Sequence, residues 1–157
     1  MTLNNQELVQ AVNEFAASIS EQPLGLAHHC PQDAAKADDS IANVAAFIEE
    51  HGGTMRFGWC FHVRPGPEEG HYLIATHHTV WHNPDDGHLV NLTPYHAEVA
   101  QQPVTHKGEL LFLVDDAASP REEGDQLLPQ PDRYFAVGDS DSLMQHIAEL
   151  ESARRSA

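Results

Sequence analysis

The chain has 157 residues, enough for one domain with a substantial core, and we expect a single domain over 1–157. It carries 24 acidic against 8 basic residues, a formal charge of −16 with histidine neutral, so its surface repels phosphate backbones and nucleic-acid binding is not expected. No apolar run approaches the roughly 18 residues of a membrane span, and the N-terminus MTLNNQELVQAV resembles no secretory signal. These features predict a cytoplasmic protein with no membrane partner.

Two helices are predicted in the N-terminal third. Residues 5–19 place their apolar side chains on one helical stripe, and Asn4 with Glu7 forms a capping-box pattern. A second helix is predicted over 40–51, with Ser40 as its N-cap and a glycine pair at its end. Between them, residues 21–39 contain two prolines and a glycine and are predicted to form a long loop.

The remainder of the chain is dominated by strand patterns. Strands are predicted at 57–63, 71–82, 88–92, 109–115 and 133–137. The acidic, Pro- and Gly-containing stretch 115–132 is predicted to be an exposed loop, and a last helix to begin after Asp139 or Ser140. The expected fold is α+β: two N-terminal helices, an antiparallel sheet of four to five strands and a C-terminal helix.

Residues 71–94, HYLIATHHTVWHNPDDGHLVNLTP, carry the strongest functional signal. The turn NPDDG separates two strand patterns and predicts a β-hairpin. If His82 pairs with Gly87, His78 lies directly opposite Asn91 on the same face of the sheet. A shift of one residue would place Thr79 there instead. A histidine oriented by an amide suits either a catalytic base or a metal ligand.

The order of His, Trp, a Gly-containing turn, an acidic or amide residue and Thr-Pro resembles the His/Asp hairpin of transglutaminase-like and papain-like thiol enzymes. A similar hairpin occurs in uncharacterised small bacterial proteins. The likeness covers about 50 residues, from the Ile41-Ala-Asn-Val segment to Thr93-Pro94. It implies that His78 is the base and Asn91 its orienting partner. The resemblance also implies a cysteine near residue 40, where this chain has Ser40-Ile41, and Cys30 lies about ten residues upstream.

Cysteines and histidines supply further candidates. Cys30 stands in a polar loop beside His28 and His29, which makes it the better nucleophile candidate of the two cysteines. The chain has twelve histidines, and a set such as His28, His62 and His78 could bind zinc or another transition metal. The alternative is that these are surface or hydrogen-bonded histidines of the sheet.

Two functions therefore remain open at the level of sequence. In the first, the protein is a thiol hydrolase or acyltransferase acting on an amide or thioester of a small molecule or peptide. Cys30 attacks, His78 accepts the proton and Asn91 orients the imidazole. In the second, it is a non-catalytic binding or accessory domain, with or without a metal held by histidines. The sequence does not indicate an oligomeric state.

Overall fold

A computed structural model describes residues 4–36, 39–94 and 109–156. Its elements, in chain order, are α1 (Asn5–Ile19), β1 (Leu24–His29), α2 (Ser40–His51), β2 (Thr54–Pro65), a 3₁₀ turn (Pro67–Glu69), β3 (His71–His82), β4 (Leu89–Asn91), β5 (Glu109–Val114), β6 (Arg121–Glu123), β7 (Gln126–Leu128), β8 (Arg133–Val137) and α3 (Asp141–Ser156). None of the helices in these described ranges is both long enough and apolar enough to cross a bilayer.

The predicted helices over 5–19 and 40–51 are confirmed in their bounds. The amide N–H of Glu7 donates to Asn4 Oδ1 at 2.8 Å, so Asn4 caps α1 as its sequence context indicates. At the start of α3 the N–H of Leu143 donates to the Ser140 hydroxyl at 3.2 Å. Polar side chains therefore cap the N-terminal ends of both α1 and α3.

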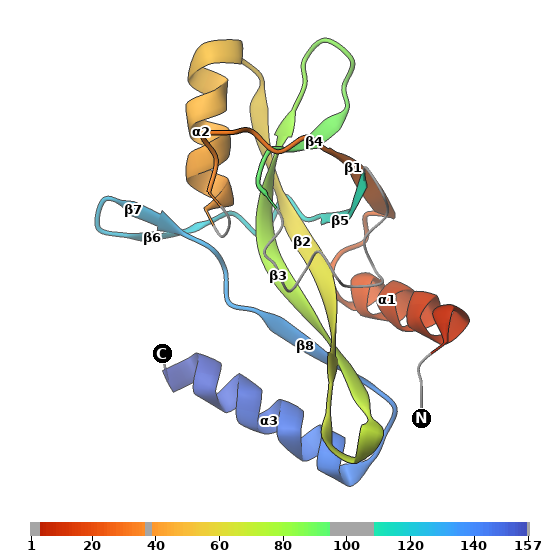
Figure 1. Ribbon diagram of the computed structural model, residues 1–157. Coiled ribbons are helices and arrows are strands. Elements are labelled where there is room, and N and C mark those ends of the chain that lie inside the picture. The colour runs from red at the N-terminus through yellow and green to blue at the C-terminus, as the bar shows by residue number, and fades with distance from the viewer. Residues whose placement is uncertain (1–3, 37–38, 95–108, 157) are drawn as a thin grey trace.

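The prediction of a simple antiparallel sheet of four to five strands is wrong. Within the described residues the main sheet has six strands in the order β2-β5-β1-β4-β3-β8, and β2 also pairs with β3, so five strands close into a barrel (Figure 1). Within it β1 and β4 run parallel, with His29 beside Asn91. Closure and the parallel pair both depend on contacts between strands distant in sequence, which local patterns do not report.

Two predicted loops contain strands. β1 lies within 21–39 and pairs with both β4 and β5, although Pro23 and Gly25 interrupt the strand pattern there. Within 115–132, β6 and β7 form a separate two-stranded sheet that turns at Gly124 with φ +61°. In Figure 1 this hairpin extends away from the barrel.

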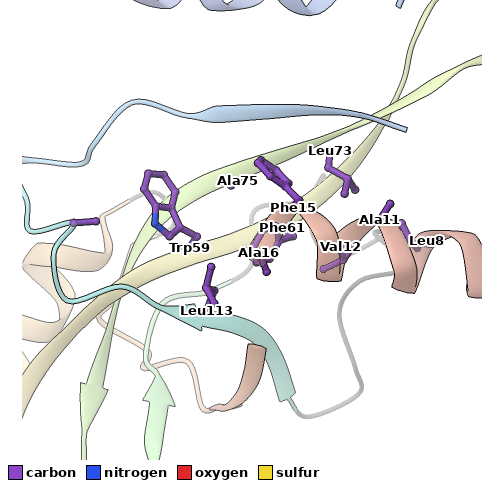
Figure 2. Packing of buried hydrophobic residues seen from close by; sticks show 11 residues of the cluster. Leu8, Ala11, Val12, Phe15, Ala16, Trp59, Phe61, Leu73, Ala75 and Leu113 are labelled. Atoms are coloured by element: carbon purple, nitrogen blue, oxygen red, sulfur yellow. The ribbon is translucent and has the colours of Figure 1, made fainter. Parts of the chain in front are cut away.

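The long β2–β3 ladder is the centre of the molecule. It pairs continuously from Thr54↔His82 to Pro65↔His71. The end at Thr54 and His82 belongs to the barrel, and β8 pairs with β3 near the other end, at residues 71–75. One face packs against α1, as Figure 2 shows for Phe15 above Phe61. The core on this face comprises Leu8, Ala11, Val12, Phe15, Ala16, Trp59, Phe61, Leu73, Ala75, Leu113 and Ala118. The other face of the ladder is left for the barrel interior and the candidate site.

The β3–β4 hairpin forms as predicted, but in a different register. His82 pairs with Leu89 and Trp81 with Val90, so the connection is two residues longer than a His82–Gly87 pairing requires. The N–H of Asn83 donates to the carbonyl of His88 at 2.9 Å and closes the loop. Because the shift is even, every side chain stays on its predicted face.

Candidate functional site

A cavity of about 570 Å³ lies where the first turn of α2 meets the β2–β3 ladder. Its walls are formed by α2, by the four strands β2, β3, β4 and β5, and by the β6–β7 hairpin. The lining residues are Asp39, Ser40, Ile41, Ala42, Ala45, Cys60, His62, Thr76, His77, His78, Asn91, Thr93, Pro94, Leu110, Asp125, Leu127, Leu128 and Pro129. This volume is in the range of small-molecule sites.

His78 and Asn91 are brought together. The atoms His78 Nε2 and Asn91 Oδ1 lie 2.8 Å apart. The contact is diagonal rather than directly cross-strand, because the register differs by two residues from the one expected. The pair predicted from the hairpin therefore exists, through a different geometry.

The orientation of the Asn91 amide is set by its backbone neighbours. Asn91 is 1% exposed, its Oδ1 accepts the N–H of Thr93 at 3.2 Å, and its Nδ2 donates to the Thr93 carbonyl at 3.1 Å. The same Nδ2 donates to Nδ1 of His29 at 2.9 Å. All four hydrogen-bonding positions of the amide are thus used.

This network determines both imidazole tautomers. His78 Nε2 faces the amide oxygen and must carry the proton, which leaves its Nδ1 as a lone-pair acceptor. His29 Nδ1 faces an amide N–H and must be the unprotonated nitrogen. Among the residues that the structure describes, Nδ1 of His78 has no hydrogen-bond partner. A neutral imidazole with one available lone pair is the form that a general base requires.

The surroundings of His78 keep it uncharged. Burial inside the barrel lowers the pKa of His78 to about 4, with the Asn91 hydrogen bond opposing the shift and the neighbouring His77 and His29 adding to it. The ring of Phe112 meets the imidazole edge-on at a centroid distance of 6.3 Å. Burial also lowers the pKa of His29. At neutral pH both rings are neutral.

Ser40 lies at the open edge of β3. On the side of β3 away from β2, β8 pairs only with residues 71–75 and β4 only with Trp81 and His82. The first turn of α2 fits between them, and Ser40 Oγ accepts the N–H of Thr79 at 3.1 Å. The prediction that Ser40 is the N-cap is wrong: Asp39 is the N-cap, and Ser40 is the first helical residue with its hydroxyl turned to the sheet.

A second set of contacts ties α2 to the strand that carries Asn91. Asn43 Nδ2 donates to the Thr93 hydroxyl at 3.0 Å and to the Lys36 carbonyl at 2.8 Å. The N–H of Lys36 returns to Asn43 Oδ1 at 3.1 Å. Because Thr93 also holds the Asn91 amide, hydrogen bonds tie Asn91 to Asn43 on α2, the helix that begins at Ser40.

Neither cysteine occupies the position of a nucleophile. Cys30 is exposed and does not line the cavity; its N–H donates to the Asn91 carbonyl, while His29, the residue before it, turns inward to the Asn91 amide. Successive side chains of an extended segment point to opposite sides. Cys60 does line the cavity, but its burial raises the pKa of the thiol. The two cysteines are not joined in a disulfide.

The predicted metal ligands do not converge. His28 is exposed and packs against His88 with ring centroids 4.9 Å apart, whereas His62 binds the Thr76 hydroxyl at 2.9 Å inside the barrel. His78 is engaged by Asn91. Across residues 4–36, 39–94 and 109–156 no three His, Cys, Asp or Glu side chains are arranged to hold a metal ion.

The sequence did not assign a role to Thr93 or Asn43. His29 was predicted only as a loop residue beside Cys30 and as an alternative to His28 among the metal ligands, because β1 was not recognised. The Asn91-Leu-Thr93 spacing, in which the side chain of the first residue meets the backbone of the third, is a local signal that could have identified Thr93.

Three comparisons of the chain, with protein-family models, with curated proteins and with solved structures, find no match. The interpretation of this site therefore depends on its own geometry.

Proposed function

We propose that the protein is a hydrolase or acyltransferase whose nucleophile is Ser40, with His78 as general base and Asn91 as the residue that orients it. One observation carries the proposal. Burial keeps His78 neutral and the Asn91 amide fixes its tautomer with Nδ1 available, in a cavity that Ser40 also lines. A carboxylic ester, thioester or amide is the substrate class that such groups process.

The surroundings of Ser40 suit a nucleophile better than those of Cys30. The hydroxyl lies at the N-terminus of a 12-residue helix, where the backbone dipole stabilises developing negative charge. The first-turn N–H groups of Ile41 and Ala42 have no helical acceptor, and both residues line the cavity. They are the candidate donors to an oxyanion. The position of Ser40 is also the one at which the thiol-enzyme resemblance leads us to expect the nucleophile.

The proposed reaction proceeds in two halves. The Ser40 hydroxyl proton passes to His78 Nδ1 as Oγ bonds to the acyl carbon, and the tetrahedral oxyanion forms beside the first turn of α2. Collapse breaks the bond to the leaving group, which takes the proton from His78. Water or another acceptor then attacks the acyl-serine by the same route, and Ser40 regains its proton. Asn91 keeps the imidazole in one tautomer throughout.

A second candidate function is ligand binding without catalysis. In the described part of the chain no hydrogen bond joins Ser40 to His78, and Ser40 Oγ instead accepts the N–H of Thr79. For catalysis, the Ser40 hydroxyl and the His78 imidazole must move closer to each other when substrate binds. Catalytic hydrogen bonds often form only in the substrate complex. A binding cavity needs no such movement.

Hydrolysis of p-nitrophenyl acetate and p-nitrophenyl butyrate by purified variants separates the two candidates. We expect Ser40→Ala and His78→Gln each to lower the enzyme-dependent rate at least 100-fold. The matched control Ser142→Ala removes a serine near the start of α3, remote from the cavity, and should retain the full rate. Equal rates for Ser40→Ala and the wild type would refute the catalytic proposal.

A further inference from the structure

The walls of the cavity are mainly aliphatic. The aliphatic lining residues are Ile41, Ala42, Ala45, Leu110, Leu127, Leu128, Pro94 and Pro129. These side chains come from α2, β5, β7 and the segments beside them. An apolar ligand would replace water against them and gain the free energy of apolar burial, about 25 cal/mol per Å².

The charge of the cavity excludes anions. No lysine or arginine is among the described residues that line it, whereas Asp39 and Asp125 both contribute carboxylates. His78 adds no positive charge at neutral pH. A carboxylate or phosphate entering this space would lose its hydration without gaining a counter-charge. The net charge of the whole chain acts in the same direction.

The β6–β7 hairpin carries an apolar side chain that the fold itself does not bury. Leu127 lines the cavity yet is 48% exposed. Among the described strands β6 and β7 pair with each other alone, so no backbone ladder joins the hairpin to the main sheet. A ligand in the cavity would cover Leu127 and its neighbour Leu128.

The base of the hairpin is held by a second histidine. The N–H of Gln130 donates to Nδ1 of His77 at 3.1 Å, and His77 Nε2 donates to the Ala118 carbonyl. Arg121 Nε also donates to the Pro129 carbonyl at 3.0 Å. The two His77 bonds hold both ends of the segment against β3, and the Arg121 bond ties those ends to each other, so the wall formed by Leu127 and Leu128 is positioned before a ligand arrives.

We propose that this cavity binds an uncharged aliphatic acyl group, clamped between α2 and the Leu127–Leu128 wall, with its carbonyl carbon directed to Ser40. The inference rests on the proposed function, since it makes the acyl chain the part of the substrate that the cavity recognises. The substrate class is then a neutral medium-chain acyl ester, thioester or amide, rather than a free acid.

Binding is measured on Ser40→Ala, which cannot turn substrate over, by calorimetry with octanamide, octanoate and octylammonium at pH 7.5. We expect octanamide to bind at least ten-fold more tightly than octanoate and no more weakly than octylammonium. Adding Leu127→Asp should weaken octanamide binding at least ten-fold. The matched control Leu26→Asp changes an equally exposed leucine, 46%, that lies on β1 away from the cavity and should leave binding unchanged.

The outcomes also separate this inference from the catalytic proposal. Selective octanamide binding without any ester hydrolysis by the wild type would support the acyl cavity and refute catalysis. Ester hydrolysis that is indifferent to chain length, together with no octanamide binding, would support catalysis and overturn the inference. Tighter binding of octanoate or octylammonium, or normal binding by the Leu127→Asp variant, would overturn it as well.

Discussion

His78 donates its Nε2–H to Asn91 Oδ1 across 2.8 Å, although the two residues are not directly opposite each other on β3 and β4. The contact is made diagonally, and it succeeds because Asn91 is held from the other side by the backbone of Thr93 and the ring of His29. Asparagine fits this position because the Thr93 carbonyl and Nδ1 of His29 both accept hydrogen bonds from its Nδ2. An aspartate would place a second acceptor oxygen there and could donate to neither.

The variant Asn91→Asp tests this donor requirement. Its new oxygen would face the Thr93 carbonyl and the His29 lone pair, so the folded state should take up a proton on His29 and raise its pKa above the unfolded value. The stabilisation that the protonated His29 gives this variant is then fully present below pH 6.5 and is lost as the pH rises through the pKa of His29 in the folded state. At pH 8 we expect a loss of about 1–3 kcal/mol relative to wild type.

Denaturant unfolding at pH 6 and pH 8 measures the effect. The control Asn13→Asp alters an exposed asparagine whose Nδ2 likewise donates to a backbone carbonyl, at 2.9 Å, and should cost far less. Equal destabilisation of the Asn91→Asp variant at both pH values would show that Asn91 does not donate to His29.

The low pKa of His78 predicts acid instability. Its folded pKa of about 4 lies below the unfolded value of 6.5, so the unfolded state binds the proton first and stability falls as the pH drops from 6.5 toward 4. The contribution reaches about 3 kcal/mol, since one unit of pKa corresponds to about 1.4 kcal/mol. Burial also lowers the pKa of His29 and of His77.

Unfolding free energies of the wild type and of His78→Gln between pH 7 and pH 4 check this prediction. The variant should show a shallower decline, whereas His88→Gln, which removes an exposed histidine, should follow the wild type. A His78→Gln variant with an unaltered slope would mean that His78 titrates normally in the folded protein.

Closure of the barrel depends on a glycine. Gly58 pairs with His78 on one side and with Val114 on the other, and a Cβ there would lie 1.9 Å from the Leu113 carbonyl oxygen. Gly58→Ala should therefore push β5 away from β2 and destabilise the protein by about 1–3 kcal/mol or more. In β1, Gly25→Ala is the control, because the nearest atom would lie 3.9 Å away. Urea unfolding of both variants measures the difference, and equal midpoints would contradict the closed barrel.

The two thiols should differ in reactivity. Cys30 is exposed and should react in the native state with an aromatic disulfide reagent, whereas Cys60 is buried with a raised pKa and should react only after unfolding. Cys30→Ser should keep full ester hydrolysis if Ser40 is the nucleophile. Loss of hydrolysis in this variant would return the nucleophile to Cys30.

Local patterns were sufficient for much of the fold. The helical stripe at 5–19 and the aromatic and β-branched residues of 71–82 predicted α1 and β3 in their observed bounds. The face shared by His78 and Asn91 was also predicted. The pairing was not, because the loop after His82 closes through Asn83 and is longer than the turn residues alone indicate.

The rest of the site required long-range information. β1 is stabilised by pairing with β4 on one side and β5 on the other. Pro23 and Gly25 favour a loop in the local sequence, and the two neighbouring strands outweigh that preference. Without β1, Cys30 could not be assigned to the outside of the barrel or His29 to the inside. The approach of Ser40 to Thr79 likewise depends on the gap between β4 and β8, which no spacing in the chain reveals.

Covalent trapping tests the central claim most directly. An uncharged alkyl fluorophosphonate, followed by peptide mass spectrometry, should place one phosphonyl group on Ser40 in the wild type and in Cys30→Ser. His78→Gln should reduce that labelling at least 100-fold, because the base that accepts the hydroxyl proton is gone. No adduct on Ser40, or equal labelling with and without His78, would contradict the assignment of this cavity as a Ser40–His78–Asn91 catalytic site.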